Sequence, residues 1–204
     1  MWRPERRPGT ERGAAGAAAV LLWFAAASGW RPLALVLGAA AVHEGGHLLV
    51  LRLWGAKVTG FRLSAFGAAI EADCARLSYA RELSAVLAGP AANLLCALGL
   101  ARLGVPWTAF IGANIVLCVY NLLPVRPLDG GRALELAASW AWDPVWGDRI
   151  ARGTGAVWGL GLAAGLGYVM VRTGGSLWLI VPASGFLLRA VQEFSPRSFR
   201  SAAF

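Results

Sequence analysis

The sequence predicts an all-α polytopic membrane protein with about six transmembrane helices and a small β-hairpin between the second and third. Of its 204 residues, 57% are hydrophobic and only 15% are charged, and the mean hydropathy is +0.57. A soluble domain carries far more charge. The apolar residues gather in long runs, and one stretch, residues 57 to 72, reads instead as two short strands.

The net charge of +8 does not indicate a nucleic-acid partner. The basic residues stand singly between apolar runs and form no block, so they are better interpreted as signals of membrane topology. The three cysteines, Cys74, Cys96 and Cys118, have no CxxC spacing. We interpret them as structural residues with no redox or metal role.

Residues 1–12 are polar and are expected to form a cytoplasmic tail. Residues 13–30 form an Ala-rich apolar segment that is either a first span or a signal peptide, since its AAAS run resembles a cleavage site. Both alternatives leave residue 31 on the outer side. Residues 32–54 are long enough for a second span, and the hairpin over 57–72 is then expected on the cytoplasmic face.

The remaining elements follow from apolar runs and their interruptions. Spans are predicted over 83–103, 107–123 and 154–171, and a short helix over 130–142. A sixth apolar segment, 177–194, contains Pro182, so whether it fully crosses the membrane stays open. Residues 194–204 form a C-terminal tail. We expect one domain over 1–204 with a catalytic core at 32–135.

Counting basic residues tests this topology. With the N-terminus inside, 15 of the 19 Lys and Arg residues fall on the cytoplasmic side and 3, namely Arg31, Arg102 and Arg172, fall outside, while Arg52 lies at the inner end of the second span. Lys and Arg are enriched in cytoplasmic loops. The distribution therefore supports a cell-membrane protein with a cytoplasmic N-terminus.

The stretch HEGGH, His43 to His47, contains both histidines of the chain and lies near the middle of the second predicted span. Two histidines four residues apart share one face of a helix, so both can bind one zinc ion, with Glu44 beside them as a general base. An ionisable residue at this depth is a functional candidate by default. The alternative is that His43, Glu44 and His47 only hydrogen-bond to neighbouring helices.

A zinc hydrolase needs a third protein ligand, and the chain has no third histidine. Asp129, in the segment PVRPLDGG, is the acidic residue in an apolar segment interrupted by Pro and Gly. We expect Pro124, Pro127, Gly130 and Gly131 to keep this segment non-helical and to let it present Asp129 to the metal. The alternative is that Asp129 caps the following helix.

Together these motifs resemble the site-2 proteases, the M50 intramembrane zinc metalloproteases. The resemblance rests on HEGGH in an early span, AGPAAN in the next and NLLPVRPLDGG after the fourth, and covers residues 33–135. The compact six-span layout is most similar to the stage IV sporulation FB-type subgroup. Members of that subgroup usually continue into a CBS domain, and neither a CBS nor a PDZ domain is expected here.

The resemblance implies that His43, His47 and Asp129 bind one zinc ion and that Glu44 is the general base. It implies that Asn93 and Asn121 position the substrate, although hydrogen bonding between helices or helix capping would explain them equally well. Asn114 lies on the same face as Asn121, which is compatible with a polar groove. The hairpin is implied to hold the substrate as an added strand.

The function implied is hydrolysis of a peptide bond in or near a transmembrane segment of a membrane-bound substrate, on the cytoplasmic side. A membrane regulatory protein is a possible further partner, and no nucleic acid is expected. The alternatives are a metal-ion transporter, which usually needs metal-binding residues spread along a path, and a non-proteolytic membrane metal-binding protein. The substrate's identity does not follow from the sequence.

Overall fold

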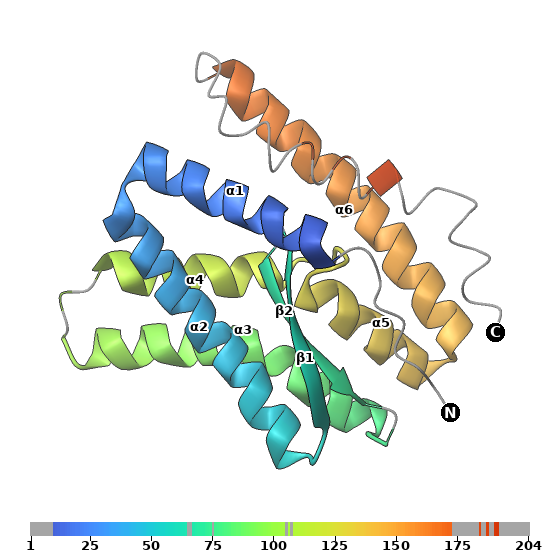
Figure 1. Ribbon diagram of the computed structural model, residues 1–204. Helices are drawn as coiled ribbons and strands as arrows, with labels where there is room; N and C mark the ends of the chain where they lie inside the picture. Colours follow the sequence, from blue (N-terminus) through green and yellow to red (C-terminus); the bar gives the residue numbers. More distant parts are fainter. Residues whose placement is uncertain are drawn as a thin grey trace. The chain divides into compact units, whose positions relative to one another are not determined.

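The computed structural model describes residues 10–64, 67–74, 76–104, 106, 108–172, 184, 187, 190 and 191. In this part of the chain, six α-helices and one two-stranded antiparallel sheet are present (Figure 1). The prediction of a mostly helical protein with a hairpin after the second helix is confirmed. By its internal contacts the chain divides into two compact units, Met1–Val119 and Tyr120–Phe204.

The first unit begins with two consecutive helices, α1 (Thr10–Ser28) and α2 (Trp30–Leu53). They are separated by Gly29, whose φ of 88° is a backbone conformation that favours glycine. Pro32 lies in the first turn of α2, where the missing backbone N–H would have no helical partner. The apolar segments predicted over 13–30 and 32–54 thus form separate helices with closely similar bounds.

The hairpin consists of β1 (Lys57–Ser64) and β2 (Gly67–Asp73), in register from the Lys57–Asp73 pair to the Ser64–Gly67 pair. The pairing is irregular between Val58 and Gly60. Both α1 and α2 contact this sheet (Figure 1). The hairpin therefore forms where the sequence predicts it and is attached to the helix that carries the histidines.

Helix α3 (Tyr79–Arg102) packs along α2 through small residues. Its start is set by Ser78, whose side chain accepts a hydrogen bond from the backbone N–H of Arg81. Four of the five buried residues of α3 recur every four positions and form one face, namely Ala85, Gly89, Asn93 and Ala97, and the fifth is Pro90. Most of them are small. Small residues let two helix backbones approach closely, as is typical of helix pairs in membranes.

Helix α4 (Thr108–Asn121) is shorter than the span predicted over 107–123. At 1.5 Å per residue its 14 residues extend about 21 Å, less than the roughly 30 Å of a hydrocarbon core. Among the described residues, three helices are long and apolar enough to cross a membrane, namely α2, α3 and α6 (Pro144–Arg172). These three helices indicate a multi-pass membrane protein.

The second unit contains α5 (Asp129–Ala141) and α6, preceded by the loop over residues 122–128. The sequence places the start of the fifth span near residue 154, but α6 begins at Pro144. Asp143 explains the earlier start: its Oδ1 accepts hydrogen bonds from the backbone N–H groups of Val145 and Trp146, at 2.7 and 3.0 Å. It caps a helix whose first residue is proline.

Within the second unit, α5 packs against α6 at a small-residue contact. A Cβ atom on Gly147 would lie 2.7 Å from the carbonyl oxygen of Glu135 and would collide with Ser139. The buried residues of α6 include Gly147, Ala151, Gly155 and Gly159, again at four-residue spacing. Glycine at these positions permits the close approach of the two helices.

Arg126 ties the 122–128 loop to both helices of this unit. Its guanidinium forms ion pairs with Glu135 on α5, at 2.7 Å, and with Asp148 on α6, at 3.0 Å. Asp148 also pairs with Arg152. Burial opposes the charge of Arg126, but the two carboxylates outweigh it and raise the pKa of the guanidinium above its ordinary value. The loop that precedes Asp129 is thus fixed at its centre.

Much of the apolar side-chain surface in the described part of the chain is exposed. Leu22, Leu95, Leu103 and Val171 are each at least 69% accessible. Large exposed apolar surfaces are uncommon on soluble monomers and are expected on helices that face lipid. The sixth predicted span, over 177–194, and the predicted tails at 1–12 and 194–204 lie almost wholly outside the described residues.

Candidate metal centre

His43 and His47 lie on one face of α2, as their spacing predicts. Their ring centroids are 4.7 Å apart and the ring planes are nearly perpendicular, at 84°. His43 is only 5% exposed. A histidine that is buried in an apolar helix needs partners for both ring nitrogens, because burying a polar group without one costs free energy.

His47 has its first partner on α3. Its Nδ1 lies 2.8 Å from the carbonyl oxygen of Ala85, which can only accept a hydrogen bond. Nδ1 of His47 therefore carries the proton, and its Nε2 presents a lone pair. Gly89, one turn further along α3, lies directly against this ring, and a Cβ atom there would collide with Nε2. Glycine at position 89 is what leaves room for the imidazole.

His43 also uses its Nδ1 to contact α3. This atom lies 2.7 Å from Oδ1 of Asn93, whose residue is fully buried. An amide oxygen accepts, so Nδ1 of His43 donates and its Nε2 presents a lone pair. The alternative reading of the histidines, hydrogen bonding to a neighbouring helix, is thus confirmed for both Nδ1 atoms. It leaves both Nε2 atoms as potential metal ligands.

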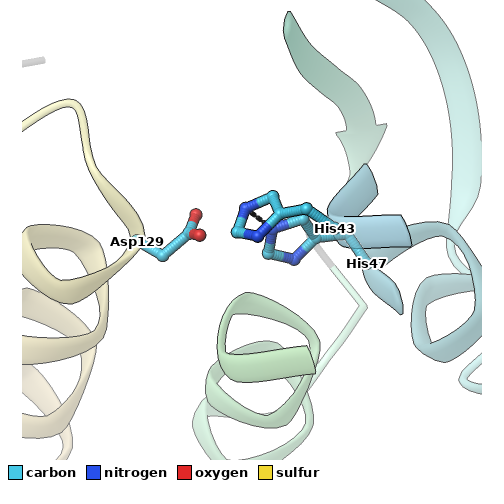
Figure 2. Close-up of side chains that lie close together, drawn as sticks. All are labelled: His43, His47 and Asp129. Atoms are coloured by element: carbon cyan, nitrogen blue, oxygen red, sulfur yellow. Dashed lines mark hydrogen bonds between the residues drawn. The ribbon is translucent and has the colours of Figure 1, made fainter. Parts of the chain in front are cut away.

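The two Nε2 atoms face one another at 3.1 Å, the approach that the dashed line in Figure 2 marks. A neutral imidazole has one N–H, and both histidines have theirs on Nδ1, so two lone pairs meet across this distance. That arrangement is stabilised by a shared cation. Zinc bound tetrahedrally with Zn–N distances of 2.0–2.1 Å would hold two nitrogens about 3.3 Å apart. The pair therefore fits a zinc ion.

Asp129 supplies the third member of the group. One nitrogen from each of His43 and His47 and one carboxylate oxygen of Asp129 all lie within 4.8 Å of one another. Figure 2 shows the aspartate pointing toward the two rings. Two imidazoles and a carboxylate, with a fourth position left for water, are a ligand set of catalytic zinc sites. This group could hold a metal ion.

Asp129 is the first residue of α5, and the residue at the capping position is Leu128. A negative charge in the first turn of a helix is favoured by the helix dipole. The alternative role of Asp129 as a helix cap stays a prediction beside its role as a metal ligand.

The two glycines after Asp129 differ from the prediction. Gly130 and Gly131 were expected to keep the segment non-helical, but both lie in the first turn of α5. Their role is close packing: a Cβ on Gly130 would lie 2.6 Å from the carbonyl oxygen of Leu123, and one on Gly131 would lie 2.7 Å from the backbone nitrogen of Arg126. The loop folds back over the start of the helix, which only glycine permits.

The other predicted site residues are placed as follows. Glu44 follows His43 on α2 and is half-buried. Asn121 is the last residue of α4 and is also half-buried. Their roles as general base and as substrate-positioning residue stay predictions. Asn93 makes its contacts with His43 and with other buried polar groups.

Two contacts of His47 are not predicted from the motifs. The Ala85 carbonyl, which orients His47, has no side-chain signature, and Gly89 belongs to AGPAAN, but the motif does not show that this glycine makes room for the imidazole. The spacing of Ala85, Gly89, Asn93 and Ala97 was an available signal. It marks one face of α3, and the asparagine on that face is the position that meets His43.

In sequence, the chain is similar to proteins described as zinc metalloproteases. It is 34% identical over 165 residues to "Putative zinc metalloprotease sll0528" of Synechocystis, a match that covers 72% of this chain and 43% of that protein. It is 30% identical over 162 residues to "Putative zinc metalloprotease Rip3" of Mycobacterium tuberculosis, covering 73% of this chain and 39% of that protein. The chain thus spans about two fifths of these relatives. No protein-family model matches it.

In structure, the chain is similar to "Site-2 Protease from Methanocaldococcus jannaschii". The TM-score is 0.63, the sequence identity is 22%, and the match covers 88% of this chain and 86% of that one. This likeness shows that the chain has a site-2 protease fold. The sequence relatives are thus described as zinc metalloproteases, and the structural relative shares the fold of this chain.

Proposed function

We propose that this chain is an intramembrane zinc metalloendopeptidase of the site-2 protease type, which hydrolyses a peptide bond in or near a transmembrane segment of a membrane-bound substrate. One observation carries the proposal. The Nε2 atoms of buried His43 and half-buried His47 face each other at 3.1 Å in an apolar helix, with an aspartate oxygen within 4.8 Å. The similarity to proteins described as zinc metalloproteases supports the same conclusion.

His43, His47 and Asp129 would hold the zinc ion. When bound, zinc lowers the pKa of a water molecule to about 7 and polarises the substrate carbonyl. The Nδ1 contacts with Asn93 and Ala85 keep both imidazoles in the tautomer that metal binding requires. Asp129 lies in the first turn of α5, where the helix dipole favours a negative charge.

Glu44 is proposed as the general base. It follows His43 directly, so its side chain leaves the helix beside the histidine face. A carboxylate there can accept a proton from the attacking water and deliver it to the leaving amine. Asn121 is proposed to steady the substrate backbone.

The hairpin is proposed to bind the substrate in an extended form. A peptide bond in a helix has its carbonyl hydrogen-bonded and shielded, so it must unwind before hydrolysis. Over the described residues the sheet has only the two strands β1 and β2, and each has one edge without a strand partner. A substrate segment could pair with such an edge as an added strand.

The chain is proposed to lie in the cell membrane with its N-terminus and the hairpin on the cytoplasmic side and with six spans, as in the stage IV sporulation FB-type subgroup. Arg–aromatic pairs support the placement of α2. Arg31 lies 5.6 Å from the ring centre of Trp30 at one end, and Arg81 lies 4.9 Å from that of Trp54 at the other. Such side chains favour the membrane–water interface.

The domain organisation is proposed as a single protease domain over 1–204, with its catalytic core at 32–135. The substrate is proposed to be a membrane protein, and a membrane regulatory protein is a further proposed partner.

The deciding experiment compares wild type with Glu44→Gln in the membranes of cells that express each chain. Mass spectrometry of new N-termini should find membrane-protein fragments that are present with the wild type and are absent with Glu44→Gln or with a zinc chelator. Both purified chains should contain about one zinc ion. Equal fragment sets from the two chains would refute a proteolytic function. A wild type without bound zinc would refute the metal site.

A further inference from the structure

We propose that Asn93 is a positioning residue that holds His43 ready to bind a metal ion, and that Asn114 fixes the orientation of the Asn93 amide. The inference rests on the proposed metal site, but it concerns the apoprotein as well. The resemblance to site-2 proteases implies a different role for Asn93, contact with the substrate. The hydrogen bonds of the buried asparagines favour the positioning role.

The bond network begins at a backbone carbonyl that can only accept. Nδ2 of Asn114 lies 2.9 Å from the carbonyl oxygen of Phe110, one turn earlier on α4. This contact requires the amide nitrogen on that side, so Oδ1 of Asn114 faces Asn93. The distance from Asn93 Nδ2 to Asn114 Oδ1 is 2.8 Å.

A second carbonyl gives the same orientation for Asn93. Its Nδ2 lies 2.9 Å from the carbonyl oxygen of Ala39 on α2, one turn before His43. Both hydrogens of the Asn93 amide are therefore donated, one to Ala39 and one to Asn114. Turning the amide over would place its oxygen against two acceptors, at the cost of two buried hydrogen bonds.

The orientation of the Asn93 amide determines the tautomer of His43. With its nitrogen held by two acceptors, Asn93 can offer His43 only its oxygen, at 2.7 Å from Nδ1. Nδ1 must then donate, so Nε2 is kept unprotonated and directed toward His47. The wrong tautomer would place a proton where the metal binds.

The burial of both asparagines also favours the positioning role of Asn93 over contact with a substrate. Asn93 and Asn114 are both completely inaccessible to solvent and are among the largest fully buried side chains in the described part of the chain. A substrate would have to displace the Asn93 contacts with Ala39, Asn114 or His43 to reach its amide. Keeping a buried polar network fully satisfied is the lower-energy arrangement.

The test uses nitrogen NMR of the full chain in lipid nanodiscs. The protein has only two histidines, so ¹⁵N-histidine labelling reports on these two rings alone, and a His47→Gln sample assigns them. In the metal-free wild type, both rings are expected to be protonated on Nδ1. Finding His43 protonated on Nε2 in the wild type would overturn the proposal without any further variant.

Two variants remove the network at different points. Asn93→Leu removes the acceptor and should release His43 from the Nδ1–H form, leave the tautomer of His47 unchanged and weaken zinc binding by about 10- to 100-fold. Asn114→Leu leaves the Asn93–His43 contact in place but lets the amide turn over, so a smaller change in the same direction is expected. If Asn93→Leu does not fold, the same two measurements on Asn114→Leu test the inference.

Cys118→Ala is the matched control, because Cys118 is buried on α4 one turn after Asn114 and is outside the network. It should change neither the tautomer nor zinc affinity. Unchanged His43 protonation and zinc affinity within twofold of wild type in the asparagine variants would refute the inference. That outcome would leave the proposed function intact. The proposed function fails only if the wild type itself binds no zinc or cleaves no membrane protein.

Discussion

Gly89 on α3 lies against the imidazole of His47 on α2, and no side chain fits between them. A Cβ atom at this position would meet Nε2, Cε1 and Cδ2 of the ring. The ring can give way only by losing its hydrogen bond to Ala85 or its alignment with His43. The close approach of the two helices is thus coupled to the geometry of the metal centre.

Gly89→Ala is therefore expected to weaken zinc binding by about 10- to 100-fold, the range seen when the groups that orient a metal ligand are disturbed. Competition with a zinc-selective chelator measures this. The matched control is Gly99→Ala on the same helix, where a Cβ meets nothing within 4 Å. Gly99→Ala should retain zinc and gain about 0.5–1 kcal/mol of stability. Equal zinc affinity in the two variants would show that the glycine is not needed for the site.

Asp129→Ala should remove most of the bound zinc and leave the fold intact, because the residue at the capping position of α5 is Leu128 and not Asp129. Asp143→Ala is expected to do the reverse. Asp143 caps α6 through two backbone N–H groups, so its loss should cost about 0.5–2 kcal/mol of stability while zinc content is unchanged. Zinc analysis and thermal unfolding of both purified variants distinguish the two roles. Full zinc occupancy in Asp129→Ala would contradict its role as a ligand.

Arg126→Leu should destabilise the second unit, because it leaves Glu135 and Asp148 without the cation between them. Both ion pairs are partly buried, so we expect a loss of about 1–3 kcal/mol. A double-mutant cycle with Glu135→Gln measures the coupling directly, since the second change should cost little once Arg126 is absent. Strictly additive effects on the unfolding free energy would show that the pair contributes nothing.

The proposed orientation predicts opposite labelling of the two ends of α3. Cys74, just after β2, should be protected in intact cells from a membrane-impermeant thiol reagent and should react in inverted vesicles. Leu103→Cys, in a chain whose three native cysteines are replaced by alanine, should react in intact cells, because Leu103 is 78% exposed at the other end of α3. Labelling of Cys74 from outside would reverse the topology.

The sequence was sufficient for the features that depend on local pattern. The apolar runs predicted α2 and α3 to within a few residues, the HEGGH spacing placed two imidazoles on one face, and residues 57–72 formed the hairpin. Each of these depends on a local pattern, the length of an apolar run or the spacing of neighbouring residues, that is visible in the chain itself.

Two features of the second unit differ from the prediction. Hydropathy started the fifth span near residue 154 because Asp148, Arg149 and Arg152 interrupt the apolar run. The Asp143–Pro144 pair was the local signal for the true start of α6. Gly130 and Gly131 were assigned to backbone irregularity, whereas the reason for them is the loop that folds over the helix.

Asn93 shows the same limit at the site itself. Its position in AGPAAN indicated functional importance, but its partners Ala39, His43 and Asn114 lie on two other helices. No spacing within α3 reveals which of its atoms faces which partner. Only the three-dimensional network separates an asparagine that orients a ligand from one that contacts a substrate.

The Arg–aromatic pairs at the two ends of α2 relate the depth of the candidate metal centre in the membrane to the thickness of the bilayer. Trp30 and Trp54 are separated by about 36 Å along the helix at 1.5 Å per residue, with His43 about 20 Å from the first. In a thinner bilayer the helix must tilt or the lipid must deform. Hydrophobic mismatch would therefore shift the depth of His43 and His47 below the membrane surface.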